Sequence, residues 1–138
     1  MNLIQAIKDM KTNELHEGLG VHDGKLKELP QTPNCVSSQT DQKSKKVDPL
    51  PYLGTAAESK AKLLAYFADK PEVEVITDEP NYLYVVYTSE KNQWKDDVEF
   101  YFDDANQRIE FRSGSRTGFG DFGVNRKRYD TIKAAYCG

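Results

Sequence analysis

Basic side chains gather near the C-terminus in a pattern that could bind an anion. Arg126, Lys127 and Arg128 follow a glycine-rich loop, and Arg112 and Arg116 lie shortly before it. The first three fall in the first turn of a predicted helix, where free backbone N–H groups attract anions and repel cations. A guanidinium also binds carboxylates and phosphates through two parallel hydrogen bonds. The pattern therefore predicts an anion site or, alternatively, an internal network of ion pairs with acidic residues elsewhere in the chain.

A second candidate chemistry rests on Cys35, which precedes Val36 and two serines. A cysteine becomes a nucleophile when a base lies within hydrogen-bond reach and the surroundings favour the thiolate. His16 or His22 could provide the base, and the arginine-rich loop could stabilise the thiolate. The alternative is a buried structural cysteine, which is common for free cysteines.

Two other kinds of site are disfavoured by spacing. Cys35, Cys137 and two histidines do not form a zinc-ligand pattern, so we expect no metal and no cofactor. The loop 118–123 matches G-x-G-x-x-G, but only fifteen residues follow it. A dinucleotide site needs a second parallel strand after the loop, and these residues leave no room for it. We interpret the loop as a flexible turn that carries two phenylalanines.

The elements that must position these residues lie in the second half of the chain. Thr55 and Glu58 form a capping box, which predicts a helix over residues 56–69 that ends before Pro71. Alternating and β-branched patterns then predict four strands, over residues 72–77, 82–88, 97–102 and 108–116. A last helix is predicted with Asn125 as its N-cap and with Val124 packed against Tyr129.

The last two predicted strands alternate strictly, and this pattern sets how they pair. If Asp103 pairs with Arg108, then Phe100 faces Phe111 on one side of the sheet. On the other side Glu99 then faces Arg112. A slip by one residue would place the aromatic side chains opposite charges, so we expect the first register.

These elements predict an α+β fold of two layers in the order α-β-β-β-β-α, preceded by an irregular N-terminal segment. The antiparallel sheet has four strands, and both helices cover its apolar face. The other face carries charged residues and tyrosines. We expect this polar face to stay open for a ligand or a partner.

The first 54 residues are expected to wrap around a core formed by residues 55–138, with one structural domain overall. Residues 1–11 predict a short amphipathic helix, and residues 37–48 predict a solvated loop. The short helix is too polar to span a membrane and lacks the features of a secretion signal. We therefore expect a cytoplasmic protein.

Composition and charge restrict the class of partner. The chain has 138 residues, of which 38% are hydrophobic and 30% charged, as in one globular domain. Residues 69–110 hold twelve acids and four bases, whereas residues 111–138 hold six bases and two acids. A net charge of −3 argues against a nucleic-acid partner. An anionic small molecule or another protein remains as the expected partner. The sequence does not determine the oligomeric state.

Four segments together resemble a family of uncharacterised bacterial and plastid proteins, the domain of unknown function 1499. The segments are Pro33–Ser38, Asp97–Asp103, Ile109–Ser113 and Ser115–Arg128. The chain departs from the family pattern at Gly120, where relatives usually carry serine, and at Gly114, where they often carry alanine. The resemblance implies no known activity. It implies one cluster of Asn34, Cys35, Ser38, Asp97, Glu99, Arg112, Ser115, Arg116, Asp121, Asn125, Arg126 and Arg128.

We therefore expect a small binding module that holds an anionic small molecule or peptide. Its ligand-binding residues are predicted to be Asn34, Ser38, Glu99, Arg112, Ser115, Arg116, Asp121, Asn125, Arg126 and Arg128. Two alternatives stay open. One is an enzyme or redox protein that uses Cys35, and the other is an interaction or assembly domain whose open sheet face binds a partner.

Overall fold

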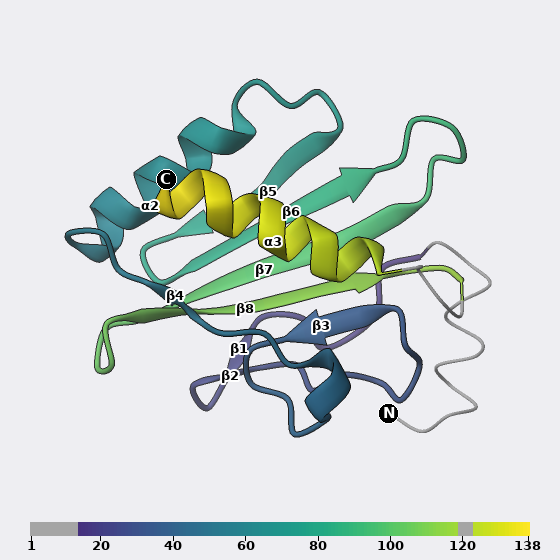
Figure 1. Cartoon of the computed structure of the whole chain (residues 1–138), viewed down its shortest axis with the longest axis horizontal. Helices are drawn as coiled ribbons and strands as arrows, with labels where there is room; N and C mark the ends of the chain where they lie inside the picture. The colour runs from purple at the N-terminus through teal and green to yellow at the C-terminus, as the bar shows by residue number, and fades with distance from the viewer. Residues whose placement is uncertain (1–13, 119–122) are drawn as a thin grey trace.

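The predicted α+β class is confirmed, with a larger sheet than the sequence indicates. A computed structural model describes residues 14–118 and 123–138 (Figure 1). The predicted helix in residues 1–11 lies outside this range. In chain order the elements are β1 (Val21–His22), β2 (Lys25–Leu26), β3 (Cys35–Ser37), the 3-10 helix η1 (Lys43–Lys45), β4 (Leu50–Pro51), α2 (Ala56–Phe67), β5 (Val73–Glu79), β6 (Tyr82–Thr88), β7 (Lys95–Asp103), β8 (Arg108–Ser115) and α3 (Val124–Cys137).

The main sheet has six strands in the order β3-β8-β7-β6-β5, and β4 also pairs with β8. Cys35 of β3 lies opposite Gly114, near one end of β8, and Leu50 of β4 lies opposite Ile109, near the other. All pairs between the named strands are antiparallel. The prediction of four strands was wrong because β3 and β4 are only three and two residues long. Such short segments cannot show an alternating pattern.

The predicted pairing of β7 with β8 is confirmed. Phe100 lies opposite Phe111, Glu99 lies opposite Arg112, and Asp103 lies opposite Arg108. Phe100 and Phe111 have no exposed surface, and their rings meet edge to face at 5.4 Å between centroids. This hairpin therefore supplies the centre of the hydrophobic core.

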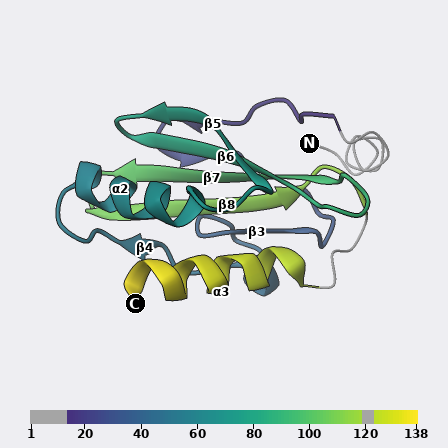
Figure 2. The same cartoon turned by 90° about the horizontal axis from the view of Figure 1, so that it is seen from above.

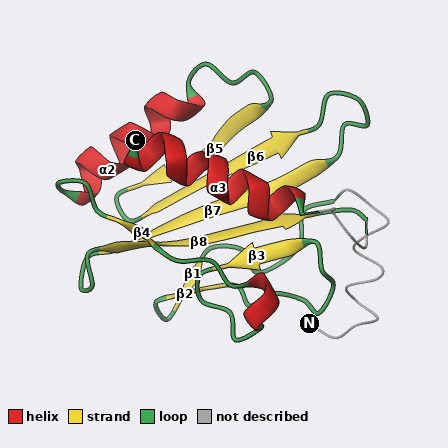
Figure 3. Cartoon of the chain, in the orientation of Figure 1, coloured by secondary structure: helices red, strands yellow, loops and turns green. Residues whose placement is uncertain are grey.

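Both helices lie on the same face of the sheet, as predicted (Figures 2 and 3). The capping box of Thr55 and Glu58 is present at the start of α2. Leu63 of α2 and Ile132 of α3 pack into the core against the phenylalanines of β7 and β8. The predicted N-cap of the last helix was wrong: Gly123 precedes α3 with φ 78°, and Asn125 is a buried residue of the first turn. Glycine adopts this left-handed conformation without strain.

The second face of the sheet is covered, so the expectation of an open face was wrong. Leu26 of the β1–β2 hairpin packs against Tyr82, Tyr84 and Val86 of β6. Figure 2 shows the N-terminal segment on the side of the sheet opposite to α3. The hairpin was missed because its two strands contain only two residues each.

The segment 37–48 is not the solvated loop that its polar sequence predicts. Ser37, Ser38, Thr40, Lys45 and Val47 are buried. Ser38 exchanges hydrogen bonds with the backbone of Phe111, and Lys45 donates to two carbonyls. Hydrogen bonds of this kind allow polar side chains to be buried. Within the described ranges, no helix is long and apolar enough to cross a bilayer.

Removing the apolar contact of the hairpin should destabilise the whole domain. We expect Leu26→Ala to lower the free energy of unfolding by about 3 kcal/mol, because it deletes a buried side chain and leaves a cavity. Urea unfolding followed by circular dichroism measures this loss. The neighbouring exposed Lys25 provides the control, and Lys25→Ala should change stability by less than about 0.5 kcal/mol. Equal effects of the two substitutions would contradict a covered second face.

Candidate functional site

Glu99 and Arg112 form a fully buried acid–base pair on the second face. Glu99 has no exposed surface, and only 4% of Arg112 is exposed. The Oε2 atom of Glu99 accepts hydrogen bonds from the Tyr82 hydroxyl at 2.5 Å and from the Gly20 N–H at 2.7 Å. Its Oε1 atom lies 3.7 Å from Arg112 Nη1. Burial raises the pKa of Tyr82, and the neighbouring Glu99 carboxylate raises it further.

A second pair, Arg116 with Asp97, lies beside the first. The Nε and Nη2 atoms of Arg116 donate to the Asp97 carboxylate at 3.0 Å and 2.8 Å. Tyr84 completes the group, since its hydroxyl donates to Asp97 and accepts from Arg116. Burial is the main reason why the pKa of Tyr84 is raised, and its hydrogen bond to Asp97 adds to the shift. Hydrogen bonds to Asp97 raise the pKa of Arg116 in turn.

On the helical face, four of the predicted site residues meet in a polar junction of Asn34, Ser115, Asn125 and Arg128. The Nδ2 atom of Asn125 donates to the Asn34 carbonyl at 3.0 Å and to the Ser115 hydroxyl at 2.9 Å. Arg128 donates to Asn125 Oδ1 at 2.7 Å and pairs with Asp96 at 2.8 Å. The junction therefore connects β3, β8 and the first turn of α3.

The remaining predicted residues lie elsewhere. Arg126 donates to the carbonyls of Ser44 and Lys46, next to η1. Ser38 binds the backbone of Phe111 and donates to the Glu110 carboxylate at 3.1 Å. Asp121 lies outside the described residues. The predicted single cluster is thus divided into separate groups. Arg112, Arg116 and Arg128 pair with carboxylates, as in the ion-pair network that the sequence left open, whereas Arg126 donates to backbone carbonyls.

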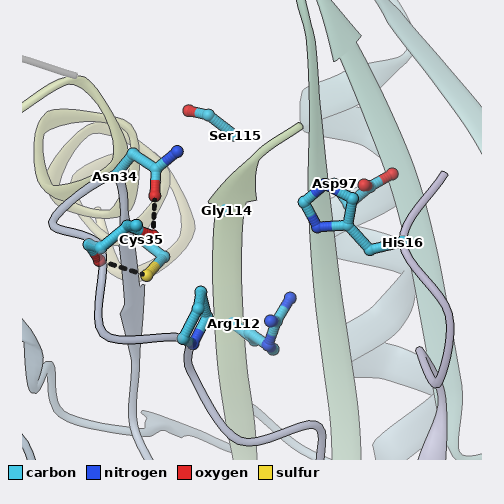
Figure 4. Close-up of a pocket in the computed structure, with 9 residues that line it drawn as sticks. His16, Asn34, Cys35, Asp97, Arg112, Gly114 and Ser115 are labelled. Atoms are coloured by element: carbon cyan, nitrogen blue, oxygen red, sulfur yellow. Dashed lines mark hydrogen bonds between the residues drawn. The ribbon is translucent and has the colours of Figure 1, made fainter. Parts of the chain in front are cut away.

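Cys35 is buried next to Lys45, which is not among the residues predicted from the sequence. Its Sγ atom donates to the Thr32 carbonyl at 3.4 Å and lies 4.0 Å from Lys45 Nζ. Lys45 lies in a polar run with Lys43 and Lys46, and nothing in this local sequence marks it as buried. Of the two predicted bases, His22 contacts the Gly18 and Leu19 carbonyls, whereas His16 lines a small cavity together with Cys35 (Figure 4).

A larger cavity, here called the Trp94 groove, lies between the β6–β7 connection and the start of α3. Its volume is about 520 Å³. Tyr87, Trp94, Val124 and Arg128 form much of its lining, and Ser115 reaches it from the polar junction. Trp94 is 54% exposed. A single tryptophan in a polar connection has no spacing that could indicate its function from the sequence.

No three His, Cys, Asp or Glu side chains of residues 14–118 and 123–138 form a group that could hold a metal ion. Among the cavities of the described residues, two are lined by residues that the sequence predicted for the site. These are the cavity beside Cys35 and the Trp94 groove, which share Ser115 as a lining residue.

Breaking one buried ion pair should cost far more stability than removing a peripheral arginine. We expect Arg116→Met to lower the free energy of unfolding by roughly 3–5 kcal/mol, because Asp97 would be left as a buried charge without its counter-charge. Arg126→Met should cost less than about 1 kcal/mol, since the hydrogen bonds of this arginine within residues 14–118 and 123–138 go to two carbonyls near the surface. Urea unfolding of both variants makes the comparison. A small effect at Arg116 would show that this arginine is not required by the fold.

Alkaline pH should lower the free energy of unfolding, because buried tyrosines keep their protons in the folded protein. Burial raises the pKa of Tyr82, Tyr84 and Tyr87, and it raises the pKa of Tyr129 to about 12. The unfolded chain therefore loses these protons first as pH rises above about 10, and the free energy of unfolding falls from there upwards. Urea unfolding at pH 8 and pH 11 tests this, and Tyr129→Phe should show a smaller loss than the unmodified protein. Equal stability at the two pH values would contradict it.

Comparison with known proteins supports the resemblance seen in the sequence. No curated protein matches the chain. The family model described as "Protein of unknown function (DUF1499)" matches residues 25–135. This range includes the polar junction, both buried ion pairs, Cys35 and the lining of the Trp94 groove. The chain therefore belongs to the DUF1499 family of proteins of unknown function.

Proposed function

We propose that the protein is a small-molecule binding domain whose ligand occupies the Trp94 groove. The observation that carries this proposal is a mostly apolar space of about 520 Å³ beside a polar junction. Small-molecule sites commonly have volumes of about 300–1,000 Å³, an apolar and aromatic lining and a few polar groups that orient the ligand. Tyr87 and Trp94 supply aromatic surface, and Ser115 supplies a hydroxyl.

The charges around the groove favour a ligand with an apolar body and a positively charged amine. Arg128 is occupied by Asp96 and Asn125, and its guanidinium lies 4.3 Å from the centre of the Tyr87 ring. Two exposed carboxylates, Glu72 and Glu90, remain on the lining. Carboxylates and an indole ring both attract a cation, and the complementary charge also discriminates against anions.

The anionic ligand predicted from the arginine-rich segment stays a prediction. An anion that bound Arg116 would have to compete with the buried carboxylate of Asp97, and one that bound Arg128 would have to compete with Asp96. The other predicted binding mode, by an open sheet face, finds no support because the β1–β2 hairpin covers that face in the described structure.

Trp94 is the only tryptophan of the chain, so its fluorescence reports directly on the groove. We expect saturable changes with 4-phenylbutylamine, weaker binding of 4-phenylbutanol and the weakest binding of 4-phenylbutyrate. The three probes share a ring and a chain and differ in charge. Tightest binding of the carboxylate would support the anionic ligand instead, and no saturable change with any probe would contradict binding in the groove.

A matched pair of variants tests whether the change in Trp94 fluorescence comes from binding in the groove. Val124 is a partly exposed lining residue, and Val124→Arg places a cation there. It should weaken binding of the amine at least roughly tenfold, the effect of about 1.4 kcal/mol. Val75 of β5 is similarly exposed but does not line the groove, so Val75→Arg should leave the affinity unchanged.

A further inference from the structure

We propose that Cys35 is a thiol that hydrogen peroxide oxidises, with Lys45 as its proton partner and the small cavity beside it as the binding place of the peroxide. Cys35 is not an isolated thiol. It lies against a buried amine and also forms part of a cavity wall. The proposal is independent of ligand binding in the Trp94 groove.

Lys45 is buried without a carboxylate partner. Only 8% of it is exposed, and its Nζ atom donates to the carbonyls of Pro30 at 2.6 Å and Thr32 at 2.7 Å. None of the ion pairs among the described residues includes Lys45. Besides these two carbonyls, the Nζ atom of Lys45 contacts the Cys35 sulfur at 4.0 Å.

A buried charge without a counter-charge is costly, so the electrically neutral states of this pair are favoured. In one of them a thiolate faces an ammonium, and in the other a thiol faces an amine. Burial lowers the pKa of Lys45, and the neighbouring Cys35 acts in the opposite direction. In the first state the thiol proton already lies on Lys45, and in the second the Lys45 amine can accept it, which is the arrangement of an activated nucleophile.

The cavity beside the sulfur suits a very small molecule. Its volume is about 20 Å³, whereas one water needs roughly 10–15 Å³. The charged and titratable groups on its wall are Arg112 of β8, Asp97 of β7 and His16 of the N-terminal segment (Figure 4). Gly114 keeps the space open, because a Cβ atom there would lie 3.4 Å from the Cβ atom of Cys35 and 3.7 Å from Arg112 Nη1.

Hydrogen peroxide is small enough for this cavity and oxidises thiolates. The thiolate attacks one peroxide oxygen, an S–O bond forms, and the O–O bond breaks. The departing hydroxide takes a proton from the Lys45 ammonium and leaves as water. Cys35 becomes a sulfenic acid, and the two electrons that sulfur loses reduce the peroxide.

The test uses a full-length Cys137→Ser protein, so that the exposed second thiol does not react. We expect dilute hydrogen peroxide to add one oxygen to the native protein by intact mass, with trapping by dimedone and reversal by dithiothreitol. Iodoacetamide, which is larger than the cavity, should modify Cys35 only after unfolding. Peroxide oxidation of the native protein no faster than that of free cysteine at the same pH would overturn the proposal.

Two substitutions separate the role of Lys45 from that of the cavity. Lys45→Met should slow oxidation at pH 7 on the order of tenfold or more and move the rate to higher pH, because the proton partner is lost. Lys43→Met, at an exposed lysine of the same turn, is the control and should leave the rate unchanged. Gly114→Ala keeps both reacting groups but fills the space, and should also slow oxidation. An unchanged rate in folded Lys45→Met or in Gly114→Ala would overturn the assignment of that part of the site.

Discussion

The pairing of β7 with β8 is the constraint on which the rest of the structure depends. Side chains alternate between the two faces of a strand, so one register decides the composition of both faces at once. The register that buries Phe100 against Phe111 also places Glu99 opposite Arg112 on the other face. Two charges at the centre of a sheet need further partners to be buried. The N-terminal segment provides them, because Gly20 N–H donates to Glu99 and the Lys27 carbonyl accepts from Arg112. The residues that flank the hairpin thus also supply hydrogen bonds to the ion pair, while Glu99 Oε1 is buried and has only the longer contact with Arg112 among the described residues.

The same alternation explains how neighbouring acids serve different arginines. Asp96 and Asp97 are consecutive residues of β7 and therefore point to opposite faces. Asp96 pairs with Arg128 of α3 on the helical face, and Asp97 pairs with Arg116 on the face covered by the hairpin. Three acids of residues 69–110 pair in this way with arginines of residues 111–138, across both faces of one sheet. This division separates Arg128 from Arg112 and Arg116, which lie on the other face.

The pairing of the strands shows which parts of the structure could be predicted from the sequence. The strands β7 and β8 are long enough for alternation to define them and to fix their register without knowledge of the rest of the chain, and β6 is marked by its run of β-branched and aromatic residues. The pair Glu99–Arg112 followed directly from that register. By contrast, β3 and β4 are strands because they pair with β8. The β1–β2 hairpin has its place because it packs on tyrosines of β6. The burial of Lys45 depends on the carbonyls of Pro30 and Thr32, which no local pattern places near it.

The polar junction explains why two distant segments of the chain act as one unit. Ser115 N–H donates to the Asn34 carbonyl, and Asn125 binds that same carbonyl and the Ser115 hydroxyl. Asn125 has no exposed surface, so an apolar residue there would leave several buried polar groups without partners, at about 1–3 kcal/mol each. The junction also forms a wall between the two cavities, since Ser115 lines both of them while Asn34 lines only the one beside Cys35. Ser115 must therefore fit the hydrogen-bond pattern of the junction and the walls of two cavities at the same time. These hydrogen bonds are a physical reason for an asparagine and a serine at these positions.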